Sequence, residues 1–282
     1  MIMPDPKQFF SRDGRGPNKL LGQSFLVDQG TLQNIIKAAA LRPDDTVFEI
    51  GPGLGVLTFA IAAVAERVIA VEKDEKLATI LQEEILRRKI TNIELIAADV
   101  LKLPQDIFAR ISPYRVVANI PYYLTARLIR KLLENENPPT DIILTVQKEV
   151  AERIVAKPPH MNLLALAVQV YGAPKILFPI SKKSFWPEPK VNSACILIEN
   201  ISSELFLKEK VDSKKFFHML RACFQGKRKM LQNTLAGFLA LPKGEAYKFL
   251  EKAGIRPSAR PEELSLTQWI RLARLVASAS YP

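Results

Sequence analysis

The amino-acid sequence predicts an α/β fold, with a doubly wound and mostly parallel sheet followed by a small helical part. Three observations support this prediction. Short apolar, β-branched runs alternate with helical segments over the first half, glycines cluster directly after the first run, and only helical patterns remain after residue 200. Strands and helices that alternate in this way are joined by right-handed crossovers, which place successive strands parallel in one sheet.

The first predicted element is a helix at residues 29–40, where apolar residues recur at helical spacing. The strands expected next are residues 46–50, 67–71, 93–97, 115–118 and 142–146. The helices expected between them are residues 54–65, 74–88 and 124–134. Further strands are expected at residues 163–171 and 194–199, and no long helix separates them. We therefore expect an antiparallel hairpin at one edge of the sheet.

The end of the chain has helical patterns throughout. The helices expected there are residues 214–224, 229–239, 245–253 and 266–278. Gly254 fits the end of a helix, and Pro257 fits a stop soon after it. We accordingly divide the chain into an N-terminal extension (1–20), an α/β domain (21–200) and a helical domain (201–282).

The charge of the chain is concentrated in that helical domain. Lys and Arg outnumber Asp and Glu by 40 − 29 = +11 in the whole chain, by 25 − 22 = +3 up to residue 200, and by 15 − 7 = +8 after it. Release of counterions from phosphates makes such a basic appendage favourable for binding a nucleic acid. The alternative is that these cations only solubilise a helical surface.

Several classes of protein are disfavoured by composition. No apolar run approaches the roughly 20 residues that a membrane helix needs, and the polar N-terminus has no signal-peptide core. Cys195, Cys223, His160 and His218 do not have the spacing of metal ligands. We expect a cytoplasmic protein without a metal site.

A glycine-rich loop, residues 49–55 (Glu-Ile-Gly-Pro-Gly-Leu-Gly), lies between the first strand and its helix. Glycines there let the backbone turn tightly and approach a ligand. A dinucleotide-binding loop would have its third glycine three residues after the second, but Val56 occupies that position. Because no Gly-Lys-Ser or Gly-Lys-Thr follows, the sequence also excludes a triphosphate-binding loop.

Two acidic residues end the next two strands. Glu72 can accept hydrogen bonds from both hydroxyls of a ribose, and Asp99 can accept one from the amino group of adenine. Each residue alone is more often an ordinary loop residue. Together with the glycine loop they fit S-adenosylmethionine, which has a nucleoside but no phosphate.

The segment 119–123 (Asn-Ile-Pro-Tyr-Tyr) follows the strand at 115–118. An amide and an aromatic ring on a proline-stiffened turn can hold and stack a planar base, although such a segment taken alone fits a capped turn slightly better.

From about residue 20 the chain resembles the ribosomal RNA adenine dimethyltransferases, most closely the small-subunit (16S) type. The segments that carry the resemblance are residues 21–26, 49–55, Glu72, Asp99, 119–122, 185–193, 224–235 and 260–266, in the family's order. The resemblance implies a Rossmann-like class I S-adenosylmethionine-dependent methyltransferase sheet. It also implies dimethylation of the 6-amino group of two adjacent adenosines near the 3′ end of small-subunit rRNA, in ribosome biogenesis. The partner is then small-subunit rRNA or the 30S particle, and we expect a monomer.

The same comparison implies roles for individual residues. The residues expected to bind the cofactor are Gln23, Ser24, Leu26, Glu49, Gly51, Gly53, Gly55, Glu72, Asp99, Val100 and Asn119. The residues expected to act on the base are Asn119, Ile120, Pro121, Tyr122 and Phe185. The residues expected to bind RNA are Arg221, Lys227, Arg228 and Lys229.

The chain departs from the family at three places. Ser24 replaces an asparagine, which shortens the reach of that side chain; residues 157–164 replace a more polar segment; and Asn192 replaces an acid. Two other functions stay open: a large-subunit rRNA methyltransferase of the macrolide-resistance type, and a non-catalytic RNA-binding assembly or transcription factor. A DNA adenine methyltransferase is disfavoured because its motif usually begins with Asp or Asn followed by two prolines.

Overall fold

The computed structural model describes residues 6–13, 16–18, 22–226 and 229–278. Its backbone divides into two compact units. The first contains Met1–Ala151 and Ala173–Ile201, and the second contains Glu152–Gly172 and Ser202–Pro282. A single continuous domain at 21–200 was expected, but residues 152–172 within it group with the C-terminal segment. An RNA-binding domain that begins at residue 201 stays a prediction.

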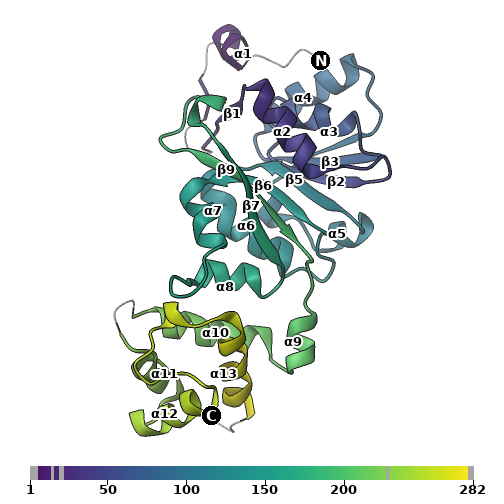
Figure 1. The fold of residues 1–282 in the computed structure, drawn as a ribbon. Coiled ribbons are helices and arrows are strands. Elements are labelled where there is room, and N and C mark those ends of the chain that lie inside the picture. Colours follow the sequence, from purple (N-terminus) through teal and green to yellow (C-terminus); the bar gives the residue numbers. More distant parts are fainter. Residues whose placement is uncertain (1–5, 14–15, 19–21, 227–228, 279–282) are drawn as a thin grey trace. The chain divides into compact units, whose positions relative to one another are not determined.

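A seven-stranded sheet forms the centre of the first unit, in the order β4-β3-β2-β5-β6-β9-β7 (Figure 1). The strands are β2 (Thr46–Ile50), β3 (Arg67–Glu72), β4 (Ile93–Ala97), β5 (Arg115–Asn119), β6 (Ile142–Gln147), β7 (Ala173–Ile180) and β9 (Ser193–Glu199). Strands β2 to β6 are parallel to one another. The predicted α/β doubly wound sheet is therefore confirmed, and its strand order reverses between β2 and β5, where such sheets bind ligands.

Helices cover both faces of the sheet. They are α2 (Gln29–Ala39), α3 (Val56–Ala62), α4 (Glu75–Arg87), α5 (Asp106–Arg110) and α6 (Thr125–Leu133). The first three lie on one face and the last two on the other (Figure 1). Asp28 and Asp74 begin α2 and α4, and their carboxylates accept hydrogen bonds from backbone N–H groups of the first turn. Such caps stabilise a helix by about 1 kcal/mol each.

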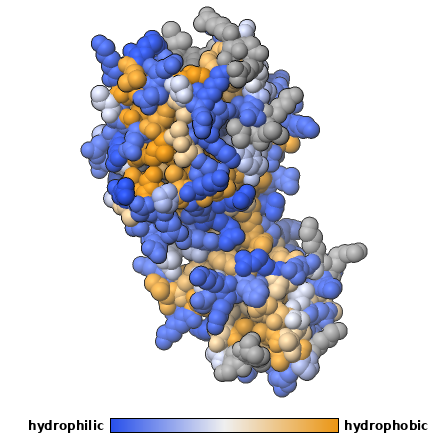
Figure 2. Space-filling model, turned by 180° about the vertical axis from the view of Figure 1, so that it is seen from behind, coloured by the Kyte–Doolittle hydropathy of each residue, from blue (hydrophilic) through white to orange (hydrophobic). Residues whose placement is uncertain are grey.

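The core lies between the sheet and these helices. Val47 and Val117 of the strands are fully buried, and they pack in one cluster with Leu32, Ile35 and Ile61 of the helices. Burial of each such side chain contributes about 1.5–3 kcal/mol. Hydrophilic residues form most of the surface visible in Figure 2, and apolar residues show in limited areas of each unit.

The predicted strand at 163–171 was wrong, because this segment is mainly the helix α8 (Leu163–Gln169). The Asn162 side chain accepts hydrogen bonds from the N–H groups of Leu164 and Ala165, at 3.1 Å each, and so begins the helix. A short run that is apolar on all sides does not distinguish a buried helix from a buried strand. The antiparallel edge itself is confirmed, but it consists of β9 paired with β6 and β7.

A two-stranded sheet joins distant segments of the first unit. Strand β1 (Phe25–Leu26) pairs antiparallel with β8 (Phe185–Trp186), so that Phe25 lies opposite Trp186 and Leu26 opposite Phe185. Helix α1 (Pro6–Asp13) packs beside them, with the Phe10 ring 5.4 Å from that of Phe25. The sequence did not predict this helix.

The second unit is helical in its described residues. Its elements are the end of α7 (Lys148–Ile154), α8, α9 (Glu204–Glu209), α10 (Ser213–Phe224), α11 (Leu231–Leu239), α12 (Lys243–Lys252) and α13 (Leu266–Ser278). Fully buried Trp269 packs against Phe224, with ring centroids 5.7 Å apart. The helices predicted after residue 200 are thus confirmed, with shifts of a few residues at their ends. No helix in the described part of the chain is long and apolar enough to span a membrane.

Candidate active site

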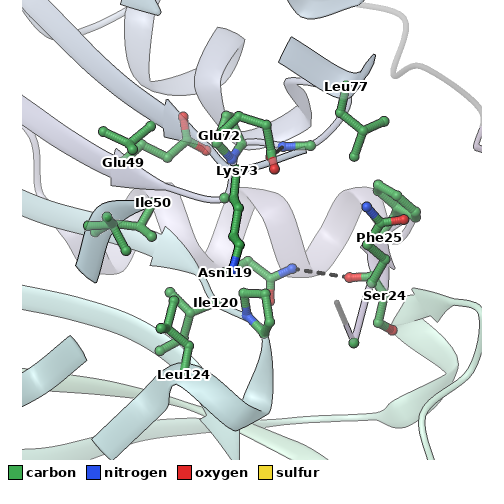
Figure 3. Close-up of a pocket in the computed structure, with 18 of the residues that line it drawn as sticks. Ser24, Phe25, Glu49, Ile50, Glu72, Lys73, Leu77, Asn119, Ile120 and Leu124 are labelled. Atoms are coloured by element: carbon green, nitrogen blue, oxygen red, sulfur yellow. Dashed lines mark hydrogen bonds between the residues drawn. The ribbon is translucent and has the colours of Figure 1, made fainter. Parts of the chain in front are cut away.

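A cavity of about 330 Å³ opens at the carboxyl ends of β2, β3, β4 and β5, beside the point where the strand order reverses. Its walls come from the loops that follow these strands, from the segment around β1 and from Phe185 of β8. All of these elements belong to the first unit. Figure 3 shows how carboxylate, amide and apolar side chains from separate strands converge on this space.

The glycine loop follows β2 and forms one wall of the cavity. Gly51 and Gly53 both line it and have positive φ angles of 69° and 58°. A Cβ atom at Gly53 would lie 3.1 Å from the Phe25 ring, so a side chain there would press on the wall of the cavity. These two glycines therefore meet the expected requirement for a close approach between backbone and ligand.

Gly55 does not line the cavity, although we expected it to bind the cofactor. Gly55 directly precedes α3 and has a φ of 81°. An added Cβ would lie 2.5 Å from Leu81 Cδ1 and 2.7 Å from Phe59 Cε2. Glycine is required here because α3 and α4 pack closely. Gly55 therefore serves the packing of the two helices behind the loop and not the wall of the cavity.

Glu72 ends β3, and its carboxylate is tied to the backbone of the cavity wall. Its Oε2 accepts a hydrogen bond from the Gly53 N–H at 3.0 Å, and its Oε1 accepts one from the Asp74 N–H at 2.9 Å. Burial raises the pKa of Glu72 above its ordinary value, although these hydrogen bonds oppose the shift. The two bonds hold the carboxylate in a fixed orientation at the cavity.

Asp99 lies after β4 and is held by two partners. Its Oδ1 accepts from the Leu101 N–H at 3.0 Å, and its Oδ2 pairs with Lys73 Nζ at 3.0 Å. Burial alone would raise the pKa of Asp99, but the Lys73 ammonium and the Leu101 N–H outweigh it and lower the pKa. The carboxylate is therefore ionised at neutral pH.

Glu49 is the most buried acid of the site, with 1% of its surface exposed. Its Oε2 has no hydrogen-bond partner among the described residues. Burial raises the pKa of Glu49 to about 8, and the nearby Glu72 carboxylate adds to the shift. Figure 3 shows the Glu49 and Glu72 side chains beside each other. A cationic ligand group placed beside Glu49 Oε2 would supply a partner and would favour the ionised form of the acid.

Asn119 ends β5, and its side chain faces the cavity. Its Nδ2 donates to the Ser24 carbonyl at 3.5 Å, the contact drawn dashed in Figure 3. Ile120, Pro121 and Tyr122 follow on the same wall. The Tyr122 hydroxyl and Ser193 Oγ share a hydrogen bond of 2.8 Å, which fixes the orientation of the ring.

Phe185 lines the cavity as expected, but only 4% of its surface is exposed, because β8 packs into the core. Leu26, its partner in β1, and Val100, which begins the turn after Asp99, also line the cavity. The predicted residues of both sets except Gly55 thus line one cavity.

The side chains of Gln23 and Ser24 are used to hold loops in place. Gln23 Nε2 donates to Asp74 Oδ2 at 2.8 Å, and Ser24 Oγ donates to the Pro187 carbonyl at 2.8 Å. Both residues line the cavity. The short Ser24 side chain therefore binds the neighbouring loop.

Several lining residues were not predicted: Gly22, Phe25, Leu54, Leu77, Lys73, Lys102, Tyr123 and Arg127. Lys73 and Tyr123 directly follow Glu72 and Tyr122, so adjacency to a predicted residue was the available signal. Leu77 and Arg127 come from the first turns of α4 and α6, and only the fold brings them to the cavity.

The predicted RNA-binding residues belong to the second unit. Arg221 on α10 and Lys229 before α11 are exposed. Lys227 and Arg228 lie outside the described residues. Their role in RNA binding stays a prediction.

Comparison with known proteins places this site in a family. Residues 15–278 match the family described as "Ribosomal RNA adenine dimethylase". A Dehalococcoides mccartyi protein named "Ribosomal RNA small subunit methyltransferase A" is 42% identical over 272 residues, covering 96% of this chain and 92% of the relative.

Two solved structures are also similar. A dimethyladenosine transferase from Plasmodium falciparum has a TM-score of 0.76 and 25% identity, covering 88% of this chain and 95% of that one. The 23S rRNA methyltransferase ErmE has a TM-score of 0.68 and 28% identity, covering 89% of this chain and 99% of that one. The chain thus belongs to the ribosomal RNA adenine dimethylase family, as its motifs predicted, and is an rRNA adenine dimethyltransferase.

Proposed function

We propose that the protein uses S-adenosylmethionine to dimethylate the 6-amino group of two adjacent adenosines near the 3′ end of small-subunit (16S) rRNA, during biogenesis of the small subunit. One observation carries this proposal: Asn119 and Tyr122 line the same cavity as the glycine loop, Glu72 and Asp99. A base and a nucleoside cofactor can therefore meet in one space.

The residues of the cavity fit this cofactor. Its volume of about 330 Å³ lies within the range of roughly 300–1,000 Å³ that is usual for small-molecule sites. Glu72 would hold the ribose, Asp99 the adenine amino group, and the partnerless oxygen of Glu49 the cationic amine of the methionine part. When bound, the cofactor supplies an electrophilic methyl group on a sulfonium.

Asn119 prepares the adenine amine to react. Delocalisation into the ring makes this amine a poor nucleophile. If Asn119 Oδ1 and the Ile120 carbonyl accept its two N–H bonds, the nitrogen can become pyramidal and its lone pair is freed. In the described part of the chain no hydrogen bond to Asn119 Oδ1 competes with this role. A dedicated base is unnecessary because the methylated ammonium is acidic and loses its proton to water.

Aromatic rings hold the target base after it leaves its stack. Tyr122, in the turn after β5, and Phe185 of β8 both line the cavity, and a base placed between such rings gains about 1–3 kcal/mol per stack. Pro121 restricts the turn that carries Tyr122. In-line placement of the amine at about 3–3.5 Å from the methyl group would then supply much of the acceleration.

The small-subunit target is favoured over the large-subunit target by the comparisons. Curated relatives named "Ribosomal RNA small subunit methyltransferase A" are 42% and 38% identical over 96% and 92% of this chain. Charged groups in the second unit, including Arg221 and Lys229, would bind the RNA backbone. We further propose that the enzyme is cytoplasmic, acts as a monomer, and takes rRNA or the 30S particle as substrate.

Substitution of Asn119 tests the proposal. Asn119→Ala should lower kcat on unmethylated small ribosomal subunits by at least about 100-fold, as the loss of a preorganised hydrogen-bonding group does, and should leave RNA affinity unchanged. Asn137→Ala is the matched control, because the Asn137 contacts are made by its backbone. Equal loss of turnover and RNA affinity in Asn119→Ala would contradict the assigned role. Failure of the wild-type protein to bind S-adenosylmethionine in calorimetry would contradict the proposed function as a whole.

A further inference from the structure

An aromatic side chain is exposed at the mouth of the cavity. Tyr123 lines the cavity immediately after Tyr122, and 51% of its surface is exposed. Gly22 lies beside it, since a Cβ there would be 3.5 Å from Tyr123 Cδ1. An exposed tyrosine gains little from the core, whereas its face can stack on a base.

Arg127 lies one helical turn after Tyr123 and lines the same cavity. It is exposed, and no ion pair to it occurs among the residues that the structure describes. Arg127 is the third residue of α6, where the helix dipole disfavours a cation. Neither an ion pair nor the stability of α6 therefore explains why an arginine occupies position 127.

Lys73, a second cation that lines the cavity, already forms an ion pair with Asp99, at 3.0 Å. Lys102 also lines the cavity and is exposed. The mouth of the cavity is thus basic, while its interior holds the acids Glu49 and Glu72. S-adenosylmethionine has no phosphate, and its one anionic group, the methionine carboxylate, would use at most one of the cations at the mouth.

We propose that Tyr123 and Arg127 hold the nucleotide next to the flipped adenosine, with the Tyr123 ring stacked on its base and the Arg127 guanidinium on the adjoining phosphate. The inference rests on the proposed function, and it adds an RNA contact on the catalytic unit. A nucleotide that enters the cavity brings its neighbour and the linking phosphate to the mouth. An aromatic ring and a guanidinium are the groups that bind unstacked bases and phosphates.

Kinetics with unmethylated small ribosomal subunits test the inference. Tyr123→Ala should raise the KM for the subunit by about tenfold, the size expected for one lost base stack, with kcat within about a factor of two and unchanged affinity for S-adenosylmethionine. Tyr123→Phe and Tyr123→Trp should keep the wild-type KM, because the ring is retained. An equal loss in Tyr123→Phe would show that the hydroxyl matters, and would overturn the stacking role.

Arg127→Gln should raise the same KM, and it should reduce the slope of log affinity against log salt by about 0.7–0.9, the value for one phosphate contact. Arg130→Gln is the matched control on α6, since Arg130 pairs with Glu134 at 2.8 Å. An unchanged salt slope in Arg127→Gln, or an equal change in Arg130→Gln, would overturn the phosphate contact. If the wild type methylates the subunit and Tyr123→Ala has the same KM as the wild type, this inference fails while the proposed function stands.

Discussion

Gly55→Ala is the substitution that best separates packing from ligand binding in the glycine loop. At φ = 81° a residue with a Cβ atom occupies the left-handed region, which costs about 1–2 kcal/mol. The new methyl group would also lie 2.5 Å from Leu81 Cδ1 and 2.7 Å from Phe59 Cε2, and overpacking of this kind costs about 1–3 kcal/mol. We therefore expect the free energy of unfolding to fall by ~2–5 kcal/mol.

Urea denaturation followed by tryptophan fluorescence measures this change, since Trp186 belongs to the same unit. Gly30→Ala is the matched control in that unit. Its Cβ would meet only Asp28 Oδ1, at 3.6 Å, and its φ is not positive. We expect it to be neutral, or to stabilise the protein by up to about 1 kcal/mol.

Calorimetry with S-adenosylmethionine completes the test. Gly55→Ala should keep most of its cofactor affinity while it remains folded, whereas Gly53→Ala should weaken binding, because its Cβ would press on the Phe25 ring at 3.1 Å. The reasoning is refuted if Gly55→Ala unfolds like the wild type but loses cofactor affinity. That result would make Gly55 a ligand contact, as the sequence suggested.

Two further predictions concern charge. The unfolded chain releases the Glu49 proton near pH 4.5, whereas the folded, ligand-free protein holds it to about pH 8. The stability that comes from holding this proton in the folded state is therefore fully present below pH 4.5 and is lost as the pH rises to about 8. At higher pH, Glu49→Gln should be more stable than the wild type by up to ~5 kcal/mol. Parallel denaturation curves across this range check it, and equal pH dependence of the two proteins contradicts the burial argument. Charge reversal at Lys227, Arg228 and Lys229 should weaken RNA binding and flatten its salt dependence, with cofactor affinity unchanged; an unchanged slope would mean that these cations only solubilise the surface.

Local patterns predicted most of the site because its residues follow strands directly. Glu72, Asp99 and Asn119 lie at the ends of strands that were recognisable from apolar, β-branched runs. The carboxyl ends of parallel strands meet at one edge of a sheet, so identifying the strands was enough to bring these side chains together. The same reasoning could not distinguish Gly55 from Gly51 and Gly53, because all three have positive φ angles and differ only in what lies beside them.

The sequence by itself determined the family, the parallel strands of the first unit with helices α2, α3, α4 and α6, and the residue types that face the ligand. These follow from periodicity and from motifs in a defined order. The sequence did not indicate helices α1 and α5 or strands β1, β7 and β8. Only the tertiary structure decided that residues 163–169 form a helix, that Lys73 pairs with Asp99, and that Arg127 reaches the mouth of the cavity. The physical reason is that a contact between residues far apart in the chain depends on how whole elements pack, and no local pattern of side chains encodes that arrangement.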